Sequence, residues 1–261
     1  MDDPLFTNRF IKQIIDARQD DIAGFIYVTK GSRMTTGKGK SKTAYLFSLL
    51  LIMGLFYFLS SSIKTILHKI RIILSKKTFF ITSPLVIDYA RSKKIKSFET
   101  ENPNSNESLN ILRELAPDII INQSQSIIGK EFLKIPSIGV INRHNALLPK
   151  NRGRLTPFWV LYKGERKTGV SIHFVEEGID SGDIIIQEQY DIHPKQTFWS
   201  LVRKNYEIAP KAILKALDKL ENGENDYIFN DDISATYNTI PDLSHAVEYR
   251  FRRIKSFLQF S

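Results

Sequence analysis

The 261-residue chain contains no cysteine, which excludes disulfide bonds and thiolate metal sites and makes a reducing compartment the default. Acidic residues are comparatively few, because 28 Asp and Glu stand against 37 Lys and Arg, for a net charge of +9. A balance of that sign favours an anionic partner, such as nucleic acid, a nucleotide-carrying substrate or an anionic membrane. The first residues are acidic and mixed, so no cleavable signal peptide is visible, and we expect a cytoplasmic protein.

Helical and extended patterns alternate along the chain. The expected helices are 5–18, 104–115, 197–220 and 243–258. The expected strands are 22–29, 117–122, 137–142, 168–177 and 183–190. A basic loop rich in Gly, Ser and Thr is expected over residues 30–42. Because helices separate most of the strands, the sequence predicts an α/β fold with a mostly parallel sheet flanked by helices.

One segment departs from this alternation. Residues 43–63 carry no charge, and as a helix they would span roughly 30 Å, about the thickness of a bilayer core. Residues 63–74 then place Ile and Leu on one helical face and basic side chains largely on the other, which is typical of helices that lie on anionic membranes. A full span would separate strand 22–29 from its sheet, so we do not expect one. Contact with a membrane surface, at the inner face, and packing on the domain or on a second subunit both stay open.

The stretch INRHNALLPKNRGR, residues 141–154, carries the first sign of chemistry. Asn142 and His144 lie at the carboxyl end of a predicted parallel strand, where open α/β sheets build their sites, and side chains two apart share one side. His exchanges protons near neutral pH, and an Asn amide donates a hydrogen bond to an oxyanion. Carboxylates that could orient the imidazole follow at Glu176, Glu177, Asp180 and Asp183. The alternative interpretation is ordinary polar chemistry at a strand end.

Over a longer stretch the chain resembles the formyltransferases that use 10-formyltetrahydrofolate, a family that includes glycinamide ribonucleotide, methionyl-tRNA and sugar-amine enzymes. The pattern N-x-H-x-x-L-L-P-x-x-R-G is followed by TGVSIHFVEEGIDSGDII. The matching residues are Asn142, His144, Leu147, Leu148, Pro149, Arg152, Gly153, Thr168, Gly169, His173, Asp180 and Gly182. The resemblance is firm over 117–190 and looser over 2–220. It implies a Rossmann-like catalytic domain over residues 1–225 with a helical insertion at 43–77, followed by a tail at 226–261 with a short helix.

The resemblance also implies roles for single residues. Asn142 would stabilise the oxyanion, His144 would help move the amine proton, and Asp180 would hold the imidazole or a water. The co-substrate is expected to be 10-formyltetrahydrofolate, with no metal. Its pterin is expected against two loops, at Gln123, Ser124, Gln125, Ser126, Ile127, Val175, Gly178, Ile179 and Asp180. His173 is expected to be a structural histidine within a strand.

The acceptor is expected beside the basic turn that follows His144. Lys150, Arg152 and Arg154 would hold a substrate phosphate, with Pro157 at the border of the acceptor, and the alternative is an exposed basic turn. The stretches NALLPKNRGRLTPFW and GERKTGVSIHF are closest to the sugar-amine enzymes. We therefore expect an aminodeoxysugar on a nucleotide or lipid, used for surface polysaccharide or lipopolysaccharide, and no nucleic acid. Formylation of methionyl-tRNA and a non-catalytic remnant that binds folate or a partner are the alternatives.

The start of the chain departs from the family. Relatives begin with a strand that leads into a segment like DDPLF, whereas residues 2–6 of this chain are that segment. We therefore expect the central first strand of the sheet to be missing.

Overall fold

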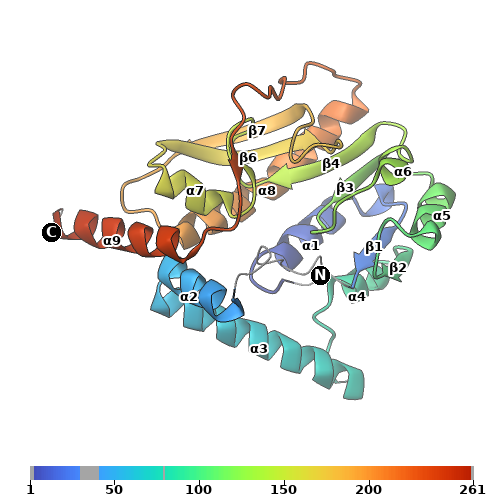
Figure 1. The fold of residues 1–261 in the computed structure, drawn as a ribbon. Coiled ribbons are helices and arrows are strands. Elements are labelled where there is room, and N and C mark those ends of the chain that lie inside the picture. The colour runs from blue at the N-terminus through green and yellow to red at the C-terminus, as the bar shows by residue number, and fades with distance from the viewer. Residues whose placement is uncertain (1–2, 30–40, 79, 260–261) are drawn as a thin grey trace.

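The computed structural model describes residues 3–29, 41–78 and 80–259, which form an α/β structure with helices packed around a sheet (Figure 1). The helices are α1 Thr7–Ala17, η1 Gln19–Asp21, α2 Lys42–Met53, α3 Leu55–Lys77, α4 Val86–Ser92, α5 Asn106–Leu115, α6 Lys130–Leu133, α7 Thr156–Tyr162, α8 Phe198–Glu221 and α9 Leu243–Gln259. The strands are β1 Phe25–Val28, β2 Ser97–Thr100, β3 Ile119–Asn122, β4 Gly139–His144, β5 Arg152–Gly153, β6 Lys167–Phe174, β7 Ile184–Asp191 and β8 Tyr237–Asn238. Most of the expected loop at 30–42 lies outside the described residues.

The larger sheet has the order β3-β4-β6-β7. β3 and β4 run parallel, whereas β6 is antiparallel to both β4 and β7. Apolar side chains of β4 and β6 pack against α1 and α8 in the main core, which includes Phe10, Ile141, Ile172 and Ile213. The predicted α/β class, the sheet flanked by helices and the strand pair at 168–190 are therefore confirmed.

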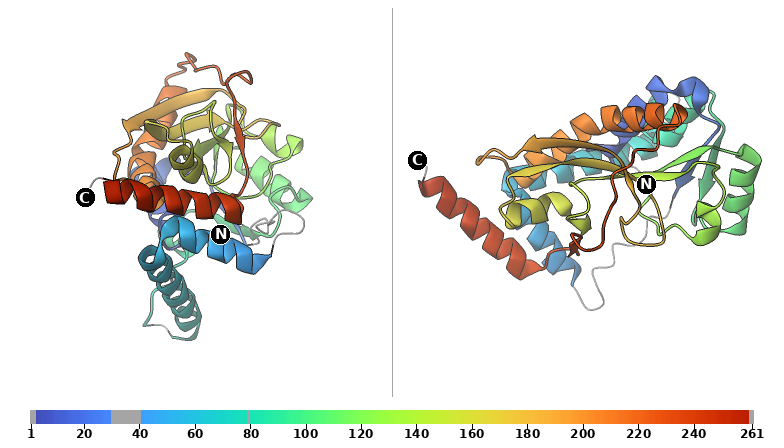
Figure 2. Two further views of the ribbon diagram at one scale, coloured as in Figure 1. Left: turned by 60° about the vertical axis from the view of Figure 1, so that its left-hand side comes forward. Right: turned by 90° about the horizontal axis from the view of Figure 1, so that it is seen from above.

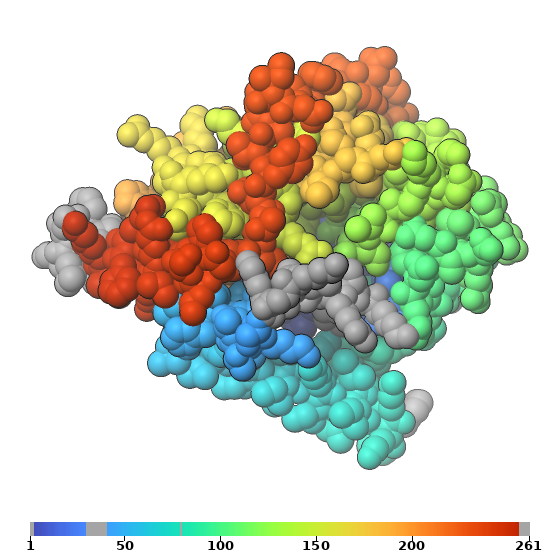
Figure 3. Space-filling model, in the orientation of Figure 1, coloured from blue at the N-terminus to red at the C-terminus, as the bar shows by residue number. Residues whose placement is uncertain are grey.

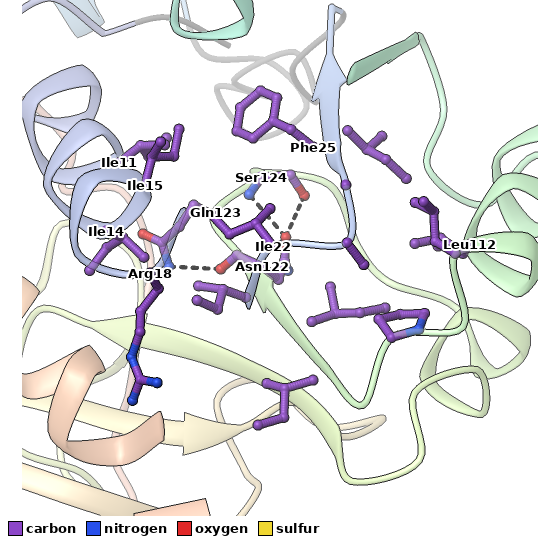
Figure 4. A pocket seen from close by; sticks show the side chains of 18 of the residues that line it. Ile11, Ile14, Ile15, Arg18, Ile22, Phe25, Leu112, Asn122, Gln123 and Ser124 are labelled. Carbon is purple, nitrogen blue, oxygen red and sulfur yellow. Dashed lines mark hydrogen bonds between the residues drawn. The ribbon is translucent and has the colours of Figure 1, made fainter. Parts of the chain in front are cut away.

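The sheet is divided in two. β1 and β2 form a separate parallel pair, and β3 is an edge strand of the larger sheet. A cavity of about 750 Å³ lies between β1 and β3, with further walls from α1 and α5. Ile11, Ile14 and Ile15 of α1 approach it from one side and Leu112 of α5 from the other (Figure 4). The cavity therefore separates the β1–β2 pair from the edge of the larger sheet.

The predicted insertion at 43–77 is a pair of helices, α2 and α3, bent by 119°. The sequence pattern placed the boundary between an apolar and an amphipathic helix near Ile63. This position is wrong, because α2 ends at Met53, α3 begins at Leu55, and the break between them falls at Gly54. Gly54 has a φ of +82°, a conformation that residues with a side chain rarely adopt. Among the described residues no single helix is long and apolar enough to cross a membrane. The bent pair of α2 and α3, taken together, has the length and composition of a broken span.

The two helices of the insertion differ in how they contact the domain. Ile52 of α2 is buried in a cluster with Phe158 and Trp159 of α7 and Tyr249 of α9, which fastens α2 to the body of the protein. α3 extends from α2 along the lower edge of the molecule in Figure 1.

The C-terminal segment after α8 packs on the domain. Ile228 bridges to Ile184 of β7, and β8 pairs in parallel with β5. In Figure 3 this segment crosses the face of the molecule over the strands that precede it. Figure 2 shows that α9 then runs outward beside α2, and its bounds, Leu243–Gln259, agree with the expected helix 243–258.

The cavity generates a prediction about stability. An apolar, β-branched strand of about six residues, a typical strand length, fused through a short linker ahead of residue 2 should enter the cavity and pair with the edge of β3. We expect the Tm to rise by at least about 5 °C, since each kcal/mol added to the free energy of unfolding raises the Tm of a protein of this size by about 2–4 °C. A Gly-Ser fusion of equal length is the control. Equal melting temperatures of the two fusions, measured by calorimetry, would show that the cavity does not accept a strand.

Candidate active site

Asn142 and His144 lie at the carboxyl end of β4, where β4 pairs with β6. The β4–β6 register places Asn142 opposite His173, so their side chains project from the same face of the sheet. The rings of His144 and His173 meet edge to face, 6.3 Å apart between centroids. Asn142 is half-buried, and both histidines are buried. The strand pairing therefore gathers an amide and two imidazoles at one place.

Asp180 meets this group from the turn between β6 and β7. Its carboxylate lies 3.4 Å from His144 Nδ1 and 3.7 Å from His173 Nε2. The same carboxylate accepts a hydrogen bond from the backbone N–H of Gly153 at 2.8 Å. Asn142, His144 and Asp180, predicted as a trio, therefore share one end of the sheet, and His173 joins them.

The turn that carries Asp180 is held by the C-terminal segment. Asp180 has a φ of +49°, and the side-chain amide of Asn230 donates to the backbone carbonyls of Asp180 and Gly182, at 2.8 Å each. The sequence analysis did not predict Asn230, because an asparagine some 50 residues away carries no local signal. Gly153 is fixed by the same segment, since a Cβ there would lie 2.1 Å from the backbone oxygen of Asn238.

The two histidines use their remaining nitrogens differently. His144 Nε2 donates to the backbone oxygen of Asn151 at 2.8 Å, which leaves Nδ1 facing the Asp180 carboxylate. His173 Nδ1 donates to the backbone oxygen of Phe174 at 2.7 Å. Burial lowers the pKa of His173 to about 4, although the Asp180 charge opposes that shift. His173 is therefore neutral at pH 7.

The Asn142 amide is oriented by Gln123, in the loop after β3. Gln123 Nε2 donates to Asn142 Oδ1 at 3.2 Å, so the oxygen of Asn142 is occupied and its Nδ2 hydrogens remain for another acceptor. Arg143 Nε in turn donates to Gln123 Oε1 at 3.3 Å, while its guanidinium lies over the Tyr206 ring. Gln123 was predicted to touch the co-substrate, and the structure adds this contact with Asn142.

The two loops expected to hold the pterin flank the same end of β4. Ile127 is 88% exposed and Ile179 is 63% exposed, so each loop presents an apolar side chain to solvent. Lys130, just after the first loop, forms an ion pair of 2.9 Å with Glu177 of the second. In the first loop the Ser124 hydroxyl donates to Asn122 Oδ1, and the backbone N–H of Ser126 donates to Ser124 Oγ. Val175, at the start of the second loop, packs against the cluster that contains Val140. Gln125 lies in the first loop and Gly178 in the second.

The residues expected to hold a phosphate are separated by the structure. Arg152 is fully buried, and its guanidinium donates to Asp232 at 2.6 Å, to the Tyr237 hydroxyl and to Asn230. It therefore anchors the C-terminal segment and presents no surface to a ligand. Lys150 and Arg154 are exposed on either side of it, and Pro157 is buried at the start of α7.

Within residues 3–29, 41–78 and 80–259, no group of three or more His, Cys, Asp or Glu side chains could hold a metal ion. The cavity between β1 and β3 borders the candidate site through Asn122, Gln123 and Ser124.

The fold and this cluster define an α/β protein with an Asn-His-Asp site at the carboxyl end of its central strand. The sequence model described as formyl transferase matches residues 75–217, more than half of the chain. The chain belongs to the formyl transferase family.

Curated relatives match over part of their length. The methionyl-tRNA formyltransferase of Fusobacterium nucleatum is 34% identical over 138 residues, which are 52% of this chain and 44% of that protein. That of Thermotoga neapolitana is 36% identical over 149 residues, 57% of this chain and 48% of that protein. The chain therefore spans about half the length of the curated relatives it matches.

Solved structures show the same fold. Glycinamide ribonucleotide transformylase 1 from Symbiobacterium toebii superposes with a TM-score of 0.50 at 19% identity, covering 56% of this chain and 75% of that one. A sugar N-formyltransferase from Shewanella gives a TM-score of 0.50 at 19% identity, covering 62% and 61%. The Rossmann-like formyltransferase architecture predicted from the sequence is thereby confirmed.

The burial of His173 generates a prediction about pH. An unfolded histidine titrates near 6.5, whereas the pKa of folded His173 is about 4, so between these values only the unfolded chain takes up the proton. Stability is therefore full above about pH 6.5 and falls as the pH drops towards 4. His173→Gln should flatten this slope in urea unfolding. The exposed His193→Gln should leave the slope unchanged, and an equal slope in both variants would contradict the assignment.

Proposed function

We propose that this chain transfers a formyl group from 10-formyltetrahydrofolate to the amine of an aminodeoxysugar, carried by a nucleotide or a lipid, in surface polysaccharide synthesis. The observation that carries the proposal is the convergence of Asn142, His144 and Asp180 in a member of the formyl transferase family. The exposed Ile127 and Ile179 support binding of the folate, because a flat pterin ring requires apolar contacts on its faces.

The chemistry follows from the groups at the end of β4. The amine nitrogen attacks the formyl carbon, a C–N bond forms, and the carbonyl oxygen becomes an oxyanion. The Asn142 Nδ2 hydrogens, left available by Gln123, stabilise that oxyanion. His144 and Asp180 carry the proton lost by the amine to the folate nitrogen as its bond to the formyl carbon breaks.

The aminosugar acceptor is supported by the sequence around the site, which resembles the sugar-amine enzymes in the turn after His144 and at the start of β6. Lys150 and Arg154 are exposed beside that turn and are suited to a diphosphate. The second candidate is formylation of methionyl-tRNA, which the names of the curated relatives favour. Those relatives are matched over less than half of their length, so the likeness does not extend to their remaining parts.

Asn142→Ala tests the role of the amide. Loss of one oxyanion donor should lower turnover by roughly 100-fold to 1000-fold, while the melting temperature stays close to that of the parent, because the side chain is half-buried at the mouth of the site. Asn110→Ala, at an exposed position of α5, is the matched control. Turnover near the parent value in the Asn142→Ala protein would refute the assignment.

The acceptor is tested by formyl transfer from 10-formyltetrahydrofolate to a panel of nucleotide-linked 3-amino and 4-amino deoxysugars, a lipid-linked aminosugar and methionyl-tRNA. We expect turnover with at least one aminosugar and none with the tRNA. Turnover with the tRNA alone would establish the second candidate. Binding of the folate without turnover of any acceptor would identify a protein that binds folate but does not catalyse.

A further inference from the structure

The long helix α3 turns an apolar face outward. Its outward side chains are each between 40% and 76% exposed and recur at intervals of three and four residues, which places them on one stripe. They are Phe56, Leu59, Ile63, Ile66, Leu67, Ile70, Ile73 and Leu74. We call these eight side chains the α3 stripe. In Figures 1 and 2 α3 lies at the edge of the molecule, away from the sheet.

The opposite side of α3, which faces the protein, carries polar and apolar side chains together, and Tyr57, Phe58 and Ile72 are half-buried there. Ser61 is buried, and Thr65, His68 and Ser75 are half-buried. The hydroxyls of Ser61, Thr65 and Ser75 bond to carbonyls of the same helix. A surface helix in water normally turns its apolar side chains inward, whereas most of those of α3 face outward. The helix is therefore suited to an apolar environment on its outer side.

The charges around the α3 stripe are of one sign. Residues 42–77 contain no Asp or Glu. At 100° per residue, Lys64 and Arg71 border one edge of the stripe, and Lys69 and Lys76 border the other. Among the described residues none of the four pairs with a carboxylate, and Arg71 Nε donates to the backbone oxygen of Thr82 at 3.2 Å. Long basic side chains in that position keep their charge in the headgroup layer while their stems lie on apolar surface.

We propose that the α3 stripe lies in the interface of an anionic lipid membrane, with α3 parallel to its plane. The charges favour lipid over a second copy of this chain, because two such stripes in contact would bring cations of the same sign together. They also favour the interface over a transmembrane position, since Lys64, Lys69 and Arg71 lie in the middle part of the helix. This inference does not depend on the proposed reaction.

The test is sedimentation of the full-length protein with vesicles of phosphatidylcholine alone or mixed with phosphatidylglycerol. We expect binding to the mixed vesicles, loss of it at high salt, and weak binding to the neutral ones. The variant Lys64→Gln, Lys69→Gln, Arg71→Gln should weaken binding by about 100-fold, since each cation near an anionic surface contributes about one factor of five. Its control has the same charge change at exposed lysines off the helix, Lys96→Gln, Lys167→Gln, Lys211→Gln, and should bind like the parent.

The apolar contribution is tested separately by one variant that combines Ile66→Gln, Ile70→Gln and Ile73→Gln. It should not bind vesicles, while its circular dichroism spectrum and melting temperature remain those of the parent. Three results would overturn the proposal. These are no binding to mixed vesicles at low salt, equal binding to neutral and mixed vesicles, or a dimer in ultracentrifugation that the isoleucine variant dissociates while vesicle binding is absent.

Discussion

The Asp180 carboxylate is the point at which separate parts of the chain meet. It faces imidazoles from β4 and β6 and accepts the Gly153 N–H, while Asn230 holds its turn from behind. None of these contacts is possible unless β4 lies between β3 and β6 in the observed register. A site built in this way is rigid, because each group is fixed by strand pairing or by a backbone hydrogen bond and not by a free side-chain rotamer.

The sequence predicted those features whose signal is local. Buried strands appear as apolar runs, and Asn142, His144 and Asp180 belong to a motif with fixed spacing. Arg152 shows where local signals end, because it has the same sequence appearance as Lys150 and Arg154 but is buried by partners some 80 residues away. The strand Ser97–Thr100 was not predicted because it is short and nearly polar, and only its parallel partner Phe25–Val28 makes it extended. The boundary at Gly54 was missed because the apolar run continues across it.

Two parts of the molecule present apolar surface without the usual cover. The cavity between β1 and β3 does so inside the fold, and the α3 stripe does so on the outside. The α3 stripe lies in the first half of the chain, whereas the cavity is lined from both halves, including Ile138, Leu217 and Leu220. The candidate site and its supports lie between residues 122 and 238. The candidate residues lie beside the core that α1 and α8 close, so this core links the N-terminal helix to the candidate site.

The contact between Asn230 and the Asp180 turn has a consequence for biosynthesis. As the chain leaves the ribosome from its N-terminus, β4, β6 and β7 are complete before Asn230 and Asn238 have been made. During that interval Asp180 lacks the Asn230 amide that holds its turn, and Gly153 lacks its strand partner Asn238. The contacts of Asn230 and Asn238 with the candidate site can therefore form only after β4, β6 and β7 have been made.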